Sequence, residues 1–304
     1  MRKYLIFLII FLAAALRVVS LDRYPAGLNA DEAAIGYNAW SLIKTGMDEH
    51  STKWPMVFRS FDDYKPAVYF YIVLPFVKLL GLNIWAVRLP STILGTLSVY
   101  LLYLIVNKLV LRSQFSVVSN NNNKLTSDIY SLKSTNVGLI AAFVLATSPW
   151  HLQFSRGGWE VNVSTFFILL GVFGFLKGLE NSKYFFLFVI SMVLSLYTYH
   201  SSRLIAPLVS LSLVVLYWNK LFVIPAQAGI HKVSTFLSVN KTVLLSAVLG
   251  IILVLPLASQ MLSKEGQSRF TGVSVFSDSG PLWQALESRR EHPAGLYTDR
   301  KSVV

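Results

Sequence analysis

Carboxylate side chains concentrate in one polar segment after the first apolar run of the sequence. Seven of the fifteen acidic residues lie between positions 21 and 65, and two of them, Asp31 and Glu32, are adjacent. A carboxylate on a polar segment can act as a general base toward a hydroxyl group. A loop that only joined two helices would be far shorter than this segment. We therefore treat the Asp31-Glu32 pair as the first candidate for chemistry.

The acidic pair opens a predicted helix over residues 31–45. Asn29 precedes it as a candidate N-cap, and Gly46 follows as a stop signal. Acidic residues also favour the positive end of a helix dipole without any chemical role. The spacing leaves both interpretations open.

Basic and polar side chains occur at the ends of later apolar runs. Lys65 stands before Pro66, and Arg88 begins the next long run; each is either a phosphate ligand or an interfacial anchor. Arg156 and Glu160 have i,i+4 spacing and could simply pair. Together, such groups at helix ends on one side of a membrane would form a surface active site. The remaining candidates on that side are Asp63, Tyr199, His200 and Arg203.

Several classes of site have no support in the sequence. Neither G-x-x-x-x-G-K-[ST] nor G-x-G-x-x-G occurs, so no nucleotide cradle is predicted. There is no H-E-x-x-H and no Cys, which excludes disulfides and thiolate metal sites from these residues. We predict no required cofactor. If a divalent metal ion takes part, Asp31 and Glu32 are its candidate ligands.

The composition is that of a membrane protein. Charged residues make up 14% of the chain, against about 25% in a typical soluble domain. The mean hydropathy is +0.55, and the apolar residues form long uncharged runs. A crossing helix needs about 20 such residues. We predict an all-α polytopic protein of the cell membrane with spans near 4–19, 89–109, 136–154, 161–179, 184–200, 204–218 and 242–262.

The net charge of +12 could indicate a nucleic-acid partner, but the basic residues flank apolar runs. With the amino terminus inside, short outer loops carry only Arg156 and Arg203. The run 66–82 then does not cross, and residues 20–87 form one large outer loop with juxtamembrane helices. The first run also resembles a signal peptide, although the later spans favour a retained helix. The basic residues placed inside are Arg2, Lys3, Lys108, Arg112, Lys124, Lys133, Lys177, Lys183, Lys220, Lys232 and Lys241.

Two further segments are notable. Residues 113–135 contain four consecutive Asn residues and are predicted to be a flexible inner loop. Residues 263–304 are predicted to be a polar outer tail, cut short by truncation of the gene. Codons for 299–304 can be chosen to match a common short-read sequencing adapter, so we interpret these six residues as an artefact.

Five motifs resemble family 39 glycosyltransferases of the GT-C superfamily, a group that includes protein O-mannosyltransferases and the aminoarabinose transferase of lipid A. The motifs occur in the family's order within residues 1–261. The chain differs from the aminoarabinose transferases by Tyr64, where they have Glu, and by Ala34, where they have Arg. The motifs are DEAAIGYNAWSLIKTG (31–46), YKPAVY (64–69), AVRLPS (86–91), SPWHLQFSRGGWE (148–160) and YHSSR (199–203).

The resemblance implies a GT-C-like helix bundle over 1–262 that takes a mannose- or pentose-like sugar from a polyprenyl-phosphate donor. The acceptor would be a protein, lipid or glycan of the cell envelope, on the extracytoplasmic side. In this scheme Asp31 is the catalytic base, assisted by Glu32. Transfer in one step predicts inversion at the anomeric carbon. Donor phosphate would be bound by Lys65, Arg88, Arg156 and Arg203, supported by Asp63, Glu160, Tyr199 and His200.

Two other functions remain open from the sequence. A polytopic transporter or flippase would also need many spans and charged outer groups, although transporters usually bind their substrate near the bilayer midplane. A non-catalytic subunit that binds a lipid-linked glycan is the third interpretation.

Overall fold

The structure, a computed structural model, describes residues 2–60, 63–118, 124–221 and 241–261. These residues form a helical protein with one small β-hairpin. The elements in chain order are α1 (Arg2–Val18), α2 (Ala30–Thr45), β1 (Val57–Ser60), β2 (Asp63–Pro66), α3 (Val68–Leu80), α4 (Ile84–Val118), α5 (Lys124–Thr147), α6 (Pro149–Arg156), α7 (Glu160–Gly178), α8 (Tyr184–Leu196), α9 (Ser202–Leu216), α10 (Trp218–Leu221) and α11 (Lys241–Met261).

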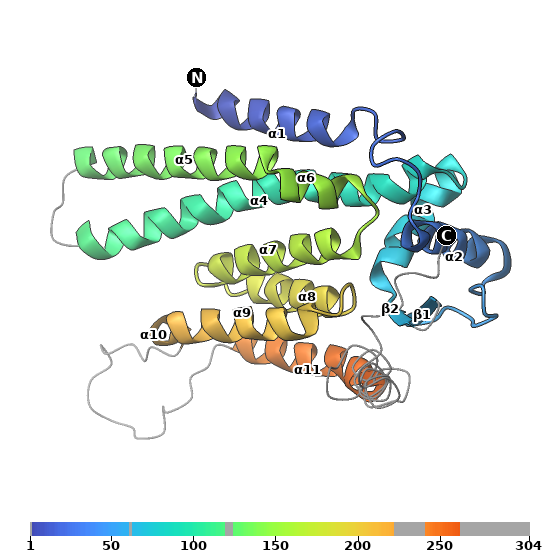
Figure 1. Ribbon diagram of the computed structural model, residues 1–304. Helices are drawn as coiled ribbons and strands as arrows, with labels where there is room; N and C mark the ends of the chain where they lie inside the picture. Colours follow the sequence, from blue (N-terminus) through green and yellow to red (C-terminus); the bar gives the residue numbers. More distant parts are fainter. Residues whose placement is uncertain (1, 61–62, 119–123, 222–240, 262–304) are drawn as a thin grey trace, which may run out of the picture.

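The long helices lie side by side as a bundle, and α2, α3 and the hairpin gather at one end of it (Figure 1). Helix α7 contacts α4, α8 and α9, so it is central. Leu208 and Leu211 of α9 and Ile251 of α11 are more than half exposed, although they are large and apolar. Exposed apolar faces of this kind are expected of helices that meet lipid.

Among the residues that the structure describes, three helices are long and apolar enough to cross a membrane: Ile84–Val110, Glu160–Gly178 and Lys241–Gln260. A fourth is added if Asn136–Thr147 and Pro149–Arg156 together make one bent span. The chain is therefore a multi-pass membrane protein by these candidate spans. Helices α1, α8 and α9 are apolar but shorter, so the prediction of seven crossings stays a prediction.

The predicted span 136–154 is made of two helices in the structure. The chain bends by 58° between α5 and α6, at Ser148 and Pro149. The residue before a proline is disfavoured in helical conformation, and Pro at the first position of a helix is favourable, so Ser148-Pro149 ends one helix and starts another. The Oγ of Ser148 accepts a hydrogen bond from the backbone N–H of His151 as the cap of α6.

Arg17 of α1 stabilises this bend. It is fully buried, and its Nη1 donates to the carbonyl oxygens of Ala13 (2.9 Å) and Ala146 (3.1 Å). Its Nη2 lies 2.8 Å from Nδ1 of His151 on α6. Carbonyl groups at the end of a helix have no partner within the helix, and a guanidinium group can supply one. Arg17 thus joins α1 to both helices of the bent pair.

The predicted inner loop 113–135 is also different in the structure. Residues 113–118 continue α4 and residues 124–135 belong to α5, so both helices extend beyond their apolar runs. Four polar Asn residues in a row suggested a loop, but the flanking Leu, Lys and Ser residues are compatible with helix. Residues 119–123 and the predicted tail 263–304 lie outside the described residues.

Glycine residues let α7 and α8 approach closely. A Cβ atom at Gly174 would lie 2.8 Å from the backbone N of Phe188, and one at Gly178 would lie 3.0 Å from the Phe185 ring. Gly171 faces Met192 in the same way, with the side-chain methyl 2.9 Å from the position of a Cβ. Small residues at such spacing are typical of packed helices in membranes, where close contact provides the stabilising van der Waals interactions.

The segment 20–87 has its own apolar core between α2, α3 and the hairpin. Ile35 and Ala39 of α2 meet Phe58 of β1 and Phe70 of α3, and the two phenylalanine rings stack with centroids 4.0 Å apart. The two helices predicted in this segment are present as α2 and α3, and their position beside the membrane stays a prediction. The hairpin was not predicted. It is antiparallel, and its register places Phe58 opposite Lys65 and Ser60 opposite Asp63.

Candidate functional site

The acidic pair stands on the first turn of α2, and the predicted cap and stop are both confirmed. Oδ1 of Asn29 accepts from the backbone N–H of Glu32 at 2.8 Å, while Oε2 of Glu32 accepts from the backbone N–H of Asn29 at 3.1 Å. This reciprocal capping box satisfies two groups at the start of the helix. Gly46 ends α2 with φ of 72°, a left-handed conformation that glycine adopts without strain.

The carboxylate of Glu32 is buried and fully hydrogen-bonded. Oε1 accepts from Nε of Arg88 (2.8 Å) and the backbone N–H of Gly158 (2.8 Å), and Oε2 accepts from Nη2 of Arg88 (3.0 Å) and from Asn29. The residue is 2% exposed. Burial alone would raise the pKa of Glu32, but the hydrogen bonds from Arg88, Gly158 and Asn29 and the charge of Arg88 hold it below the ordinary value.

Arg88 uses all five of its N–H groups within the protein. Besides the two bonds to Glu32, Nη1 donates to the carbonyl oxygens of Leu21 (2.9 Å) and Pro25 (2.8 Å), and Nη2 donates to that of Gly27. The residue is fully buried. A phosphate would have to displace one of these acceptors. Arg88 therefore joins α4 to the segment between α1 and α2 and holds Glu32 in place.

Asp31 has different surroundings from its neighbour. Its carboxylate forms an ion pair with the ammonium group of Lys65 on β2, and its side chain is 40% exposed. The side chain of Lys65 is only 10% exposed. The sequence therefore placed two carboxylates side by side, and the fold makes one accessible and the other structural.

Arg156 also bonds to backbone groups rather than to the acidic pair. It lies at the end of α6, and all of its donor nitrogens reach carbonyl oxygens at or just after the end of α1. The acceptors are Leu16 (2.6 Å), Val19 (2.9 Å), Ser20 (3.1 Å) and Tyr24 (2.9 Å). A cation in this position satisfies helix-end carbonyls and stabilises the negative end of the helix dipole.

The other predicted site residues lie at the same end of the bundle. Tyr199, His200 and Arg203 lie at the turn from α8 to α9. The carbonyl oxygen of Tyr197 in this turn accepts a hydrogen bond from the backbone N–H of Val68 at 3.2 Å. Val68 is three residues after Lys65, so the turn lies near the start of α3. Glu160 is the first residue of α7 and is buried. Asp63 belongs to β2 by its backbone, but its side chain lies outside the described part of the chain.

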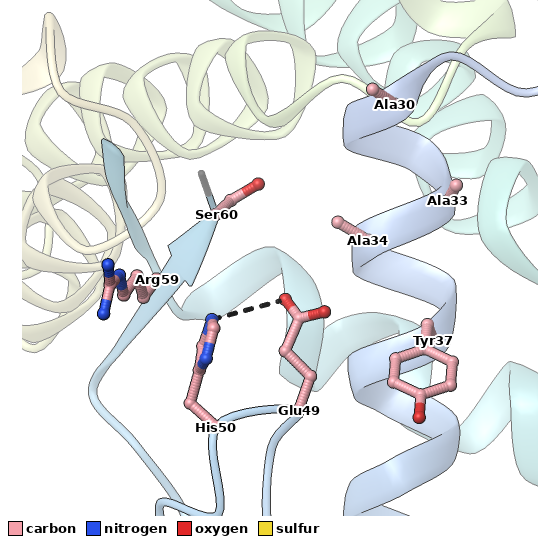
Figure 2. Close-up of a pocket in the computed structure, with 8 residues that line it drawn as sticks. All are labelled: Ala30, Ala33, Ala34, Tyr37, Glu49, His50, Arg59 and Ser60. Carbon is pink, nitrogen blue, oxygen red and sulfur yellow. Dashed lines mark ion pairs between the residues drawn. The ribbon is translucent and has the colours of Figure 1, made fainter. Parts of the chain in front are cut away.

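A cavity of about 800 Å³ lies between α2 and β1. Figure 2 shows its walls: the helix face with Tyr37 on one side, and Ser60 and Arg59 of the strand on the other. Sequence reasoning missed this cavity. The small residues on α2 were a usable signal, because they leave room in front of a helix, but the hairpin that forms the second wall was not predicted. The lining residues are Ala30, Ala33, Ala34, Tyr37, Glu49, His50, Arg59 and Ser60.

A metal ion does not fit the acidic pair as it is arranged. Across the described ranges, no group of three or more His, Asp or Glu side chains is close enough to hold one. Both oxygens of Glu32 already accept two hydrogen bonds each. Asp31 alone would remain as a ligand, and a single carboxylate is too few for a protein metal site. We therefore derive no step through a metal.

Comparison with known proteins gives no relative. No family model matches the chain, and neither a curated protein nor a solved structure does.

Proposed function

We propose that the chain is a membrane glycosyltransferase of GT-C type that transfers a sugar from a polyprenyl-phosphate donor to a hydroxyl acceptor outside the membrane. The proposal rests on the motif resemblance and on one structural observation. Of the two adjacent acids at the end of the bundle, Glu32 is buried, and each of its carboxylate oxygens already accepts two hydrogen bonds. Asp31 is accessible and forms an ion pair with Lys65. An accessible carboxylate held beside a cation, at the level where a lipid phosphate would lie, suits a general base.

In this mechanism the acceptor oxygen attacks the anomeric carbon of the donor sugar while its proton passes to Asp31. The bond between that carbon and the phosphate oxygen breaks at the same time, and polyprenyl phosphate leaves. The leaving group needs no proton, because a phosphate ester is a weak base. Direct displacement inverts the anomeric configuration.

Lys65 is the cation best placed to assist the leaving phosphate. Its ammonium group has three N–H donors, and Asp31 occupies one side of it. The donors of Arg88 and Arg156 are committed to the scaffold, so their contribution is to hold α2 and the end of α1 in position. Arg203 lies at the turn that contacts the start of α3, and it is the second candidate for phosphate.

The deciding experiment is transfer from a labelled donor. Membranes containing the full gene product should move radiolabelled sugar from undecaprenyl phosphate to envelope material, with mannose and a pentose tested as the sugar. Asp31→Asn should abolish transfer, because the amide cannot take the proton, whereas Asp22→Asn should not, since Asp22 is an exposed acid on the same segment. Absence of transfer with every donor, or full activity of Asp31→Asn, would refute the proposal.

A further inference from the structure

The cavity between α2 and β1 is lined by Ala30, the residue before Asp31, and by Ser60, which belongs to the same hairpin as Lys65. In the antiparallel hairpin, residues opposite each other share a face, and alternate residues along a strand do so too. Phe58 and Ser60 of β1 are therefore on the same face as Lys65 of β2, and all three residues are buried. That face presents Lys65 to Asp31 and Ser60 to the cavity. Asp31 and Lys65 do not line the cavity themselves, but Asp31 follows the lining residue Ala30, and its side chain is 40% exposed.

Ser60 is the most informative residue of this cavity. It is 4% exposed, and within the described residues its Oγ has no hydrogen-bond partner. Figure 2 shows this Oγ directed toward α2 across the cavity. A buried hydroxyl without a partner costs free energy unless a ligand or water completes it. The cavity therefore offers a hydrogen-bonding position that the protein itself does not fill.

The other lining groups match a polyhydroxylated ligand. The ring of Tyr37 is about half exposed and can cover the C–H face of a sugar. Glu49 accepts from Asn38 at 3.0 Å, which orients its carboxylate at the cavity, and a carboxylate can accept two neighbouring hydroxyl groups. Arg59 lies on the strand wall, but its guanidinium group points away from α2 (Figure 2). The charged group that the lining presents is therefore the carboxylate of Glu49, which lies 3.9 Å from Nε2 of His50, and this does not favour an anionic ligand.

We propose that this cavity binds a neutral saccharide, and that this saccharide is the acceptor whose hydroxyl faces Asp31. The acceptor role rests on the proposed function, whereas binding of the saccharide does not. A volume of about 800 Å³ accommodates two to three sugar rings, since binding sites for ligands of that size span about 300–1,000 Å³. A phosphate would need positive charge directed into the cavity, whereas the lining places the carboxylate of Glu49 there.

The absence of cysteine from the sequence allows a binding test that is independent of transfer. Ala34→Cys places a thiol on the α2 wall, and its rate of reaction with a membrane-impermeant maleimide can be measured in membranes. The probes are neutral trisaccharides of mannose, glucose, galactose and N-acetylglucosamine, with a neutral tripeptide for comparison. At least one trisaccharide should slow labelling at least fivefold, and Ser60→Ala should weaken that protection about threefold to tenfold.

Lys44→Cys is the matched control, because Lys44 is exposed on α2 but does not line the cavity. Its labelling should be unaffected by any trisaccharide. Failure of all four trisaccharides, or protection by the tripeptide alone, would overturn the proposal. If a trisaccharide protects Ala34→Cys from labelling but no sugar is transferred, the saccharide-binding proposal stands and the glycosyltransferase proposal is refuted. Transfer that is unaffected by Ser60→Ala and by the bulky Ala34→Trp would show that the acceptor binds elsewhere.

Discussion

Glu32 and Arg88 are 56 residues apart in the sequence and are joined by two hydrogen bonds, 2.8 and 3.0 Å long, in a buried environment. The pair links the first turn of α2 to α4. Through Gly158 it also reaches the connection between α6 and α7. Three separate segments therefore depend on one carboxylate, and the position of Asp31 depends on the same carboxylate because it is the adjacent residue.

Glu32→Gln should destabilise the protein by about 3 kcal/mol or more, because it leaves the charge of Arg88 buried without a counter-ion. The midpoint of thermal unfolding in detergent would show this. Asp22→Asn, an exposed change, should stay within about 0.5 kcal/mol of the parent protein. Equal stability of the two variants would mean that the buried pair contributes little.

The lowered pKa of Glu32 predicts a loss of stability in acid. A carboxylate whose pKa falls on folding contributes stability above its unfolded value, about 4.3, and this contribution disappears as the pH falls through the folded value. Unfolding midpoints measured from pH 7 to pH 3 should therefore drop below about pH 4.3. The drop should be smaller in Glu32→Gln, and an identical drop would assign the effect to other acids.

Asp31→Asn should lower the rate of sugar transfer by about 10²–10⁴ or more while leaving folding and donor binding nearly unchanged. The amide oxygen can still accept a hydrogen bond from Lys65, so the mostly buried ammonium group keeps a partner although it loses its counter-ion. The rate is measured with donor in excess, and folding is followed by the unfolding midpoint. Near-normal turnover would assign the base to another carboxylate, such as Glu160.

Lys65→Ala should raise the KM for the donor about tenfold to a hundredfold, because it removes a charge-assisted hydrogen bond to phosphate. Lys78→Ala is the control, since Lys78 is exposed on α3 and matches no motif. Equal effects of the two substitutions would reduce Lys65 to an interfacial anchor.

Gly174→Ala should separate α7 from α8 and destabilise the bundle by about 1–3 kcal/mol, because its Cβ would lie 2.8 Å from backbone N of Phe188. Gly250→Ala is a matched control, since its Cβ would meet only the end of the Val189 side chain. Unfolding midpoints in detergent compare the two. A larger loss at Gly250 would contradict the close packing of α7 and α8.

Local signals in the sequence predicted the local parts of the fold well. The cap at Asn29, the stop at Gly46 and the helix over 160–178 follow from neighbouring residues and from apolar runs. The bend at Pro149 had a local signal too, but the continuous apolar run outweighed it in the prediction.

The long-range contacts had no such signal. Nothing near Arg88 indicates that its partner is Glu32 rather than a phosphate, because both are anions that a guanidinium group binds in the same way. The hairpin was missed because its two strands have four residues each, too few for a clear alternation of apolar and polar positions. The cavity depends on that hairpin, so it could not be predicted either.

The shortness of α8 has a consequence for the bilayer around it. A helix of 13 residues is about 20 Å long, and the hydrocarbon layer of a typical membrane is about 30 Å thick. If α8 crosses, local thinning of the bilayer is one way to match its length, and the 15-residue α9 next to it would extend the thinned area. Hydrophobic mismatch would then draw lipid headgroups inward where the α8–α9 turn contacts the start of α3. A lipid-linked substrate would enter there through a depression in the membrane surface, with less of its chain to lift out of the hydrocarbon.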